Sequence, residues 1–213
     1  MSLNSLWVIE DSYIDKNKAR LQRKLATRLA KQHILIVCEG EKTEPNYFDA
    51  FPVSSAEVTI LGKGFNTKSL VNYAKYKAQE AKKNKVPYDQ ILCVFDKDSF
   101  TKGQFNTAIQ MADQYGFKVA YSNEAFELWY VLHFEYLTAG IDREQYIKKL
   151  SKYLGKKYKK NSTEMYDILL SRQNAAIKNA KKLLKLDGRL NPADMIPSTT
   201  VHLLVEELNR LIK

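Results

Sequence analysis

The chain has 213 residues, 45% of them hydrophobic, which is enough for one good-sized core. Lys and Arg outnumber Asp and Glu by 34 to 24, and the net charge of +10 favours polyanionic partners such as nucleic acid. No apolar run reaches the roughly 20 residues of a membrane span, and the first residues lack the pattern of a secretory signal. Cys38 and Cys93 are expected to be free thiols in the core, which predicts a cytoplasmic location.

The first segment of the chain is polar and basic. Leu21, Leu25 and Leu29 are spaced by four residues within residues 15–32, which places them on one stripe of a helix. Basic side chains surround this stripe. The pattern therefore predicts an N-terminal basic helical arm over residues 1–32.

Apolar runs without alternation then predict strands that are buried on both faces. The predicted strands cover residues 33–38, 57–61, 90–95 and 117–121. The predicted helices between and after them cover residues 43–51, 66–83, 104–115 and 123–134, with Thr43 and Asn123 as candidate caps. Strands that alternate with helices imply parallel pairing. Residues 33–140 are therefore expected to form an α/β core with a mostly parallel sheet flanked by helices.

After residue 140 the strand signal disappears. Helical patterns cover residues 142–154, 163–186 and 198–212, without a low-complexity linker. We therefore expect residues 141–213 to form a basic helical lobe that packs on the core.

Acidic residues directly follow two of the predicted strands. Glu39 follows the first strand, and Asp96 and Asp98 follow the third. Open parallel sheets bind ligands at the carboxyl ends of their strands, and residues two apart in an extended segment point the same way. Carboxylate oxygens suit Mg²⁺ (or Mn²⁺), so Glu39, Asp96 and Asp98 are candidate metal ligands. In the alternative interpretation, Asp96 caps the following turn and Asp98 lies in solvent.

These residues also carry a resemblance to known families. Residues 34–40 with residues 94–98 resemble the Toprim pattern, and residues 38–48, 123–134 and 197–205 resemble the three motifs of the RloB family. The resemblance implies a Toprim-like (Rossmann-like) fold, with Glu39 as general acid or base or as a metal ligand, and with Asp96 and Asp98 holding Mg²⁺. It also implies a role in bacterial restriction or phage defence, often beside a partner ATPase.

The helix expected after the fourth strand lies outside a standard Toprim core. Asn123 and Glu127 are four residues apart and so share one helix face near the same sheet edge. Glu127 could add a further catalytic carboxylate to the site. Alternatively, it forms a buried salt bridge with a lysine or caps neighbouring backbone. Phe126, Trp129 and His133 are expected in the core, with His133 as a minor candidate for a base.

Residues 148–160 form the most basic part of the chain. They contain no acid and seven candidate nucleic-acid-binding lysines: Lys148, Lys149, Lys152, Lys156, Lys157, Lys159 and Lys160. Lysine clusters bind phosphate backbones without sequence preference. Tyr153 and Tyr158 lie among them and could stack on unpaired bases. Lys63, between two glycines, is a further candidate phosphate contact. The alternative for the lysine run is an ordinary solvated helix face.

Together these patterns favour an Mg²⁺-dependent nuclease that cleaves phosphodiester bonds in DNA or RNA. The alternative is a subunit without chemistry of its own, which binds nucleic acid or works as an effector with a partner ATPase. Nucleotidyl transfer is a third and weaker hypothesis, because the chain has no P-loop signature.

Overall fold

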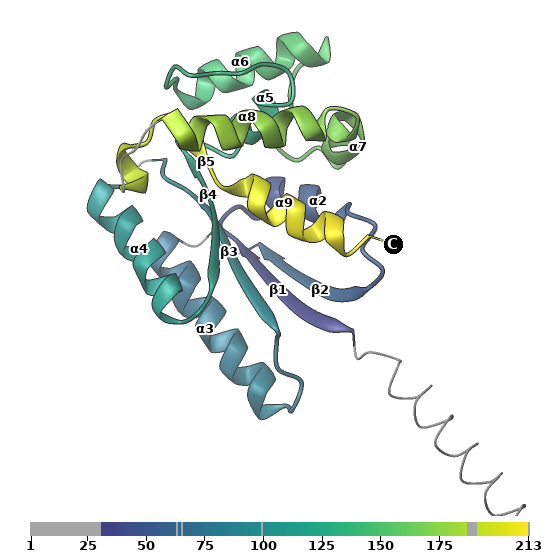
Figure 1. The fold of residues 1–213 in the computed structure, drawn as a ribbon, viewed down its shortest axis with the longest axis vertical. Helices are drawn as coiled ribbons and strands as arrows, with labels where there is room; N and C mark the ends of the chain where they lie inside the picture. The colour runs from purple at the N-terminus through teal and green to yellow at the C-terminus, as the bar shows by residue number, and fades with distance from the viewer. Residues whose placement is uncertain (1–30, 63, 65, 99, 187–190, 213) are drawn as a thin grey trace, which may run out of the picture. The chain divides into compact units, whose positions relative to one another are not determined.

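The computed structural model describes residues 31–62, 64, 66–98, 100–186 and 191–212 (Figure 1). The predicted arm therefore lies, up to residue 30, outside the described residues, and so does Lys63. The described residues from Gln32 onward belong to one compact unit. Within the part of the chain that is described, no helix has the length and apolarity needed to cross a membrane.

The described strands form one sheet in the order β2-β1-β3-β4-β5. They are β1 (Gln32–Cys38), β2 (Ala56–Gly62), β3 (Gln90–Asp96), β4 (Lys118–Asn123) and β5 (Ser198–Thr199). The first four strands pair in parallel, and only the short β5 pairs antiparallel, with β4. The predicted α/β class and mostly parallel sheet are therefore confirmed.

Helices lie on both faces of this sheet. Their bounds are α2 (Thr43–Asp49), α3 (Thr67–Lys83), α4 (Lys102–Gln114), α5 (Glu127–Val131), α6 (Arg143–Leu154), α7 (Met165–Leu170), α8 (Gln173–Leu186), the 3-10 helix η1 (Pro192–Asp194) and α9 (Val201–Arg210). Figure 1 shows α3 and α4 on one face and α2 and α9 on the other. Side-chain caps define several helix starts: Asn66 accepts a hydrogen bond from the N–H of Ser69, and Thr101 and Asp142 each open a capping box.

The two faces of the sheet carry separate hydrophobic cores. Successive residues of β1 point to opposite faces, so Ile34 and Ile36 pack with α2 and α9, while Leu35 and Val37 pack with α3 and α4. Each fully buried side chain of this size contributes about 1.5–3 kcal/mol. Burial on both faces explains why the β1 sequence is uninterruptedly apolar. Cys38 and Cys93 are buried free thiols, as predicted.

The structure corrects the prediction that only helices follow residue 140. Ser198 and Thr199 form β5, which adds to the sheet edge beside β4. The predicted helix over residues 163–186 is divided into α7 and α8. A two-residue strand has too short a pattern to detect in a sequence, because its partner strand alone defines it.

Two predicted helix caps are also wrong. Asn123 is the last residue of β4, and its side-chain amide donates to the carbonyls of Pro192, Ala193 and Met195. These bonds hold the segment that leads into β5. Thr43 is the first residue of α2 and donates its hydroxyl to the carbonyl of Lys160, 2.8 Å away. In both cases the side chain forms hydrogen bonds with residues distant in the sequence instead of capping a helix.

Candidate active site

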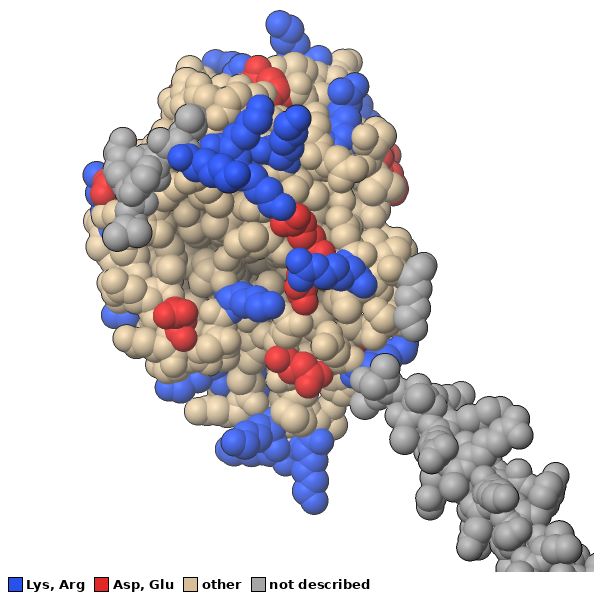
Figure 2. All heavy atoms as spheres, in the orientation of Figure 1, with Lys and Arg blue, Asp and Glu red and all other residues tan. Residues whose placement is uncertain are grey.

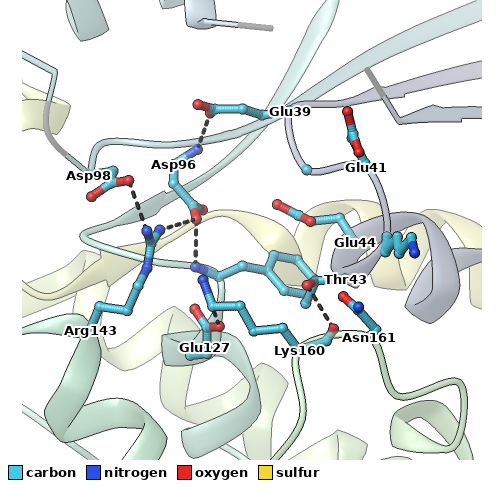
Figure 3. Close-up of a pocket in the computed structure, with 13 residues that line it drawn as sticks. Glu39, Glu41, Thr43, Glu44, Asp96, Asp98, Glu127, Arg143, Lys160 and Asn161 are labelled. Carbon is cyan, nitrogen blue, oxygen red and sulfur yellow. Dashed lines mark hydrogen bonds and ion pairs between the residues drawn. The ribbon is translucent and has the colours of Figure 1, made fainter. Parts of the chain in front are cut away.

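A cavity of about 520 Å³ opens at the carboxyl ends of β1 and β3 (Figure 3). We call it the carboxylate pocket. Among its described lining residues six are acidic and three are basic, a formal charge of −3. The lining residues are Glu39, Gly40, Glu41, Lys42, Thr43, Glu44, Asp96, Asp98, Phe126, Glu127, Arg143, Lys160 and Asn161.

The structure brings the predicted triad of Glu39, Asp96 and Asp98 into this pocket. Cys38 pairs with Val94 in the parallel register, so the residues that follow β1 and β3 leave the sheet at the same edge. Glu39 Oε2 accepts a hydrogen bond from the backbone N–H of Asp96, with a donor–acceptor distance of 3.1 Å. Neighbouring strands therefore place the Glu39 carboxylate at the backbone of Asp96.

Arg143, the first residue of α6, bridges the two aspartates. Its Nη1 donates to Asp98 Oδ2 at 2.9 Å, and its Nη2 lies 3.5 Å from Asp96 Oδ2. Asp96 Oδ2 also accepts a hydrogen bond from the N–H of Phe126, at 3.0 Å. Asp96 is buried, at 7% exposed, whereas the Asp98 side chain is 38% exposed. Asp96 and Asp98 thus share one cation, as their spacing suggested, but in this structure that cation is a guanidinium.

Glu44, in the first turn of α2, is a pocket carboxylate that the sequence analysis did not assign. Its side chain is only 5% exposed, and Figure 3 shows it directed into the pocket. Gly40 makes room for it, because a Cβ at Gly40 would lie 2.0 Å from Glu44 Oε2. Within the described chain, Glu44 Oε2 and Asp96 Oδ1 are both buried without a hydrogen-bond partner.

Glu127, the first residue of α5, also lines the pocket. It is 2% exposed, and its Oε1 lies 3.4 Å from the hydroxyl of Tyr158 and 3.9 Å from Lys160 Nζ. The two interpretations of Glu127 are therefore compatible. It belongs to the acidic cluster, and a lysine lies beside it.

All seven lysines of residues 148–160 are described, and Lys160 is the one that lines the carboxylate pocket. Its loop is attached to α2, because the carbonyls of Lys160 and Asn161 accept hydrogen bonds from Thr43 and Asn46. Lys149 instead pairs with Glu135 at 2.7 Å. Lys160 therefore lines the pocket, whereas Lys149 pairs with Glu135 outside the pocket lining.

The expectation that both tyrosines of this run could stack on bases is wrong for Tyr158. Its ring is buried, and its hydroxyl points at Glu127. Tyr153 stacks on Phe134, with ring centroids 4.8 Å apart and an interplanar angle of 6°. Packing against other side chains of the protein therefore covers ring surface that the sequence pattern predicts to be available for stacking on bases.

His133 belongs to the core, as expected. It is 2% exposed, its Nδ1 lies 2.9 Å from the carbonyl oxygen of Trp129, and burial lowers its pKa to about 4. Its ring also packs edge-on against Trp129. His133 lies outside the carboxylate pocket lining and does not serve as its base.

The pocket lacks enough positive charge for its carboxylates. Burial raises the pKa of Glu39 to about 7, although the hydrogen bond from Asp96 N–H acts in the opposite direction. Burial, followed by repulsion from Glu44 and Glu127, raises the pKa of Asp96 well above its ordinary value. Burial, followed by repulsion from Glu127, also raises the pKa of Glu44, although backbone hydrogen bonds from Glu44 and Gly40 act in the opposite direction. Clustered carboxylates hold protons in this way when no sufficient cation is near them.

The donor set fits a hard divalent cation. Carboxylate oxygens are the ligands that Mg²⁺ takes, usually from one or two protein carboxylates together with several waters. Among the described residues, no group of three or more His, Cys, Asp or Glu side chains is arranged as a ready-made metal site. Two carboxylates with water ligands would satisfy Mg²⁺ without such a group. The buried oxygens of Glu44 and Asp96 that lack partners among the described residues provide two free ligands.

The fold and the pocket define a class of protein: an α/β protein whose parallel sheet carries a cluster of carboxylates at the ends of its strands. A family model described as RloB-like protein matches residues 34–208, and the chain therefore belongs to the RloB family. This match confirms the resemblance carried by the three motifs. The Toprim-like character of the acidic residues stays a prediction. No curated protein and no solved structure matches the chain.

Proposed function

We propose that the carboxylate pocket binds a divalent ion, Mg²⁺ or Mn²⁺, and hydrolyses phosphodiester bonds in nucleic acid. The observation that carries this proposal is the charge of the pocket: its described lining has a formal charge of −3, and two buried carboxylate oxygens there lack partners in the described chain. A bound divalent ion supplies charge stabilisation at a phosphoryl oxygen and an activated water. Glu39, Asp96 and Asp98 remain the ligands that the sequence suggests.

Glu39 is the best placed group for proton transfer. A general acid or base works best when its pKa lies near the working pH, and the Glu39 pKa is raised to about 7. Its carboxylate is held in place by the N–H of Asp96, at the sheet edge rather than on a free loop. Glu39 can therefore accept a proton from an attacking water or return one to the leaving oxygen.

Basic side chains supply the binding surface for a phosphate backbone. Lys160 and Arg143 line the pocket itself, where they can contact the phosphate that is cleaved. Beyond the pocket, α8 carries exposed basic residues, and Figure 2 shows basic side chains gathered over this region of the surface. The exposed lysines of α8 are Lys178, Lys181, Lys182 and Lys185. Such contacts bind DNA or RNA without sequence preference.

Family membership suggests the biological setting of this proposal. We further propose, from the resemblance to the RloB family, that the protein works in a bacterial restriction or phage-defence system with a partner ATPase. This setting calls for an activity that damages foreign nucleic acid, which agrees with phosphodiester cleavage.

Cleavage of plasmid DNA, single-stranded DNA and RNA with Mg²⁺, Mn²⁺ or EDTA tests the activity directly. We expect cleavage that requires the divalent ion and that falls at least about 100-fold in the Asp96→Ala, Asp98→Ala double variant, or about 2.7 kcal/mol in barrier height. Asp113→Ala is the matched control, because Asp113 is exposed on α4 and lies outside the pocket lining. Unchanged cleavage in the double variant would refute the site.

One observation favours the second candidate, a nucleic-acid-binding or effector subunit without chemistry. Arg143 already binds Asp98 at 2.9 Å and lies near Asp96, so the chain neutralises part of its own acidic cluster. For a binding subunit we expect nucleic-acid affinity that falls steeply with salt, together with no cleavage in any divalent ion. That pair of results would replace the nuclease proposal.

A further inference from the structure

The carboxylate oxygens of the pocket differ in whether the chain already satisfies them. Glu39 Oε2 accepts from the N–H of Asp96, and Asp98 Oδ2 accepts from Arg143. Asp96 Oδ2 accepts from the N–H of Phe126. Glu44 Oε2 and Asp96 Oδ1 are buried and have no partner within the residues that the structure describes. Burying a carboxylate oxygen without a partner is costly, so these two atoms are the ones that need a ligand.

The backbone fixes Glu44 in the position that such a ligand requires. Glu44 lies in the first turn of α2, and the preceding loop passes so close that a Cβ at Gly40 would lie 2.0 Å from Glu44 Oε2. Thr43 and Asn46 donate hydrogen bonds to the carbonyls of Lys160 and Asn161, which attach the start of α2 to another part of the pocket lining. Figure 3 shows the Glu44 carboxylate directed towards the centre of the pocket.

Glu44 and Asp96 are also close enough to act on one another. Both residues line the carboxylate pocket, and Figure 3 shows the Glu44 carboxylate directed towards Asp96. Two buried carboxylates that repel one another across a cavity can share a cation that neither could hold alone. Asp98 differs, because it is more exposed and its charge is already balanced by Arg143.

We infer that the divalent ion of the pocket binds between Glu44 Oε2 and Asp96 Oδ1, and that Asp98 holds Arg143 in place instead of binding the ion. This inference rests on the proposed metal-binding function and changes its ligand set. Mg²⁺ commonly takes one or two protein carboxylates and completes its shell with water and phosphate oxygens. A two-carboxylate site therefore agrees with the finding that the described residues hold no cluster of three ready ligands.

Mn²⁺ binding to the full chain tests the ligand set without any assay of cleavage. Free Mn²⁺ is measured by electron paramagnetic resonance during titration of wild type, Glu44→Gln, Asp98→Asn and Glu41→Gln. Glu41 is the matched control, because it is an exposed acid that lines the same pocket. Loss of an outer-shell partner costs about 10–100-fold in metal affinity, so we expect Glu44→Gln to weaken binding at least about 10-fold. Asp98→Asn and Glu41→Gln should change it by less than about 3-fold, from lost charge alone.

The outcomes separate this inference from the proposed function. If wild type binds Mn²⁺ and Glu44→Gln binds it equally well, the inferred ligands are wrong. They are also wrong if Asp98→Asn weakens binding as much as Glu44→Gln does. In both cases the pocket still binds metal. No Mn²⁺ binding to wild type overturns both. Glu44→Asp covers the case that Glu44→Gln does not fold: it keeps the charge but withdraws the carboxylate by one methylene, and wild-type affinity in it would also overturn the inference.

Discussion

The two sides of the carboxylate pocket solve the problem of buried negative charge differently. On the Arg143 side, a guanidinium from α6 binds Asp98 at 2.9 Å and approaches Asp96 Oδ2. On the Gly40 side, Glu44 Oε2 and Asp96 Oδ1 have no partner among the residues described. One aspartate, Asp96, belongs to both sides. The chain therefore places a guanidinium against one side of the pocket, and the other side holds the two buried oxygens at which we propose that the divalent ion binds.

The two sides also differ in how they are built along the chain. Gly40 lies in the turn between β1 and α2, and Glu44 lies in the first turn of α2, so the Gly40 side needs only local structure and the neighbouring strand. Arg143 reaches Asp98 across 45 residues of sequence. The Arg143 side thus depends on how α6 packs over the sheet edge.

The largest effect is expected when Arg143 is removed and Asp98 is released. In wild type, Asp98→Asn should change Mn²⁺ affinity by less than about 3-fold. In an Arg143→Gln chain, Asp98 has lost its cation and can bind the ion, so the same substitution should weaken binding at least about 10-fold. The two effects then differ by at least about 3-fold, which is a coupling of at least about 0.7 kcal/mol in a double-mutant cycle. Titration of the four chains with Mn²⁺ measures it.

Lys149→Gln is the control for this cycle. Lys149 is a cation of the same helix, but it pairs with Glu135 outside the pocket lining. In this background, Asp98→Asn should have the same small effect as in wild type. If the effects of Arg143→Gln and Asp98→Asn on the free energy of Mn²⁺ binding are additive, Arg143 does not keep Asp98 from binding the ion.

A smaller effect is expected from the pocket lysine. Lys160 lines the carboxylate pocket, with its Nζ 3.9 Å from Glu127 Oε1, whereas Lys157 lines a different cavity. Lys160→Gln and Lys157→Gln each remove one phosphate-binding charge, so each should reduce the slope of log affinity against log salt by about 0.7–0.9. Only Lys160→Gln should also slow single-turnover cleavage, by several-fold. Equal cleavage rates in the two variants would exclude Lys160 from the reacting site.

The sheet and the first three carboxylates could be predicted because their signals are local. Uninterrupted apolar runs mark β1 and β3, and parallel pairing then requires Glu39 and Asp96 to meet at one edge. The RloB motifs were equally readable, and the family match confirms them. These features follow from periodicity, strand order and short motifs, all of which a single sequence contains.

Arg143 and Glu44 could not be assigned in the same way. Arg143 follows an ordinary helix cap, Asp142, and nothing near it indicates that α6 begins over the aspartates. Glu44 lies within the RloB-like opening motif, but its burial depends on the space left by Gly40. The lysine run predicts a base-stacking ring at Tyr158, because a charged sequence carries no sign that tertiary packing buries the ring. The sequence thus predicts which residues are available, and packing decides which of them are satisfied.

The smallest effect concerns the pH dependence of stability in the metal-free chain. The pKa of Glu39 is raised from the ordinary 4.5 to about 7, chiefly by burial. Between these values the folded chain keeps a proton that the unfolded chain has released, so the free energy of unfolding should fall as pH rises through this window. Glu44 and Asp96, whose pKa values are also raised, act with the same sign. Urea unfolding in EDTA, from about pH 5 to about pH 8, measures the slope.

Glu39→Gln removes one titrating group and should make this fall shallower, but only modestly, because Glu39 is the most exposed of the three carboxyls and water screens its charge. Mn²⁺ should flatten the wild-type profile further, since a cation between Glu44 and Asp96 stabilises their ionised forms. If the Gly40 side holds that ion, Glu44→Gln should abolish most of the Mn²⁺ effect on the profile, and Asp98→Asn should leave it in place. A free energy of unfolding that rises with pH across this window would contradict the conclusion that the pocket carboxylates lack sufficient positive charge.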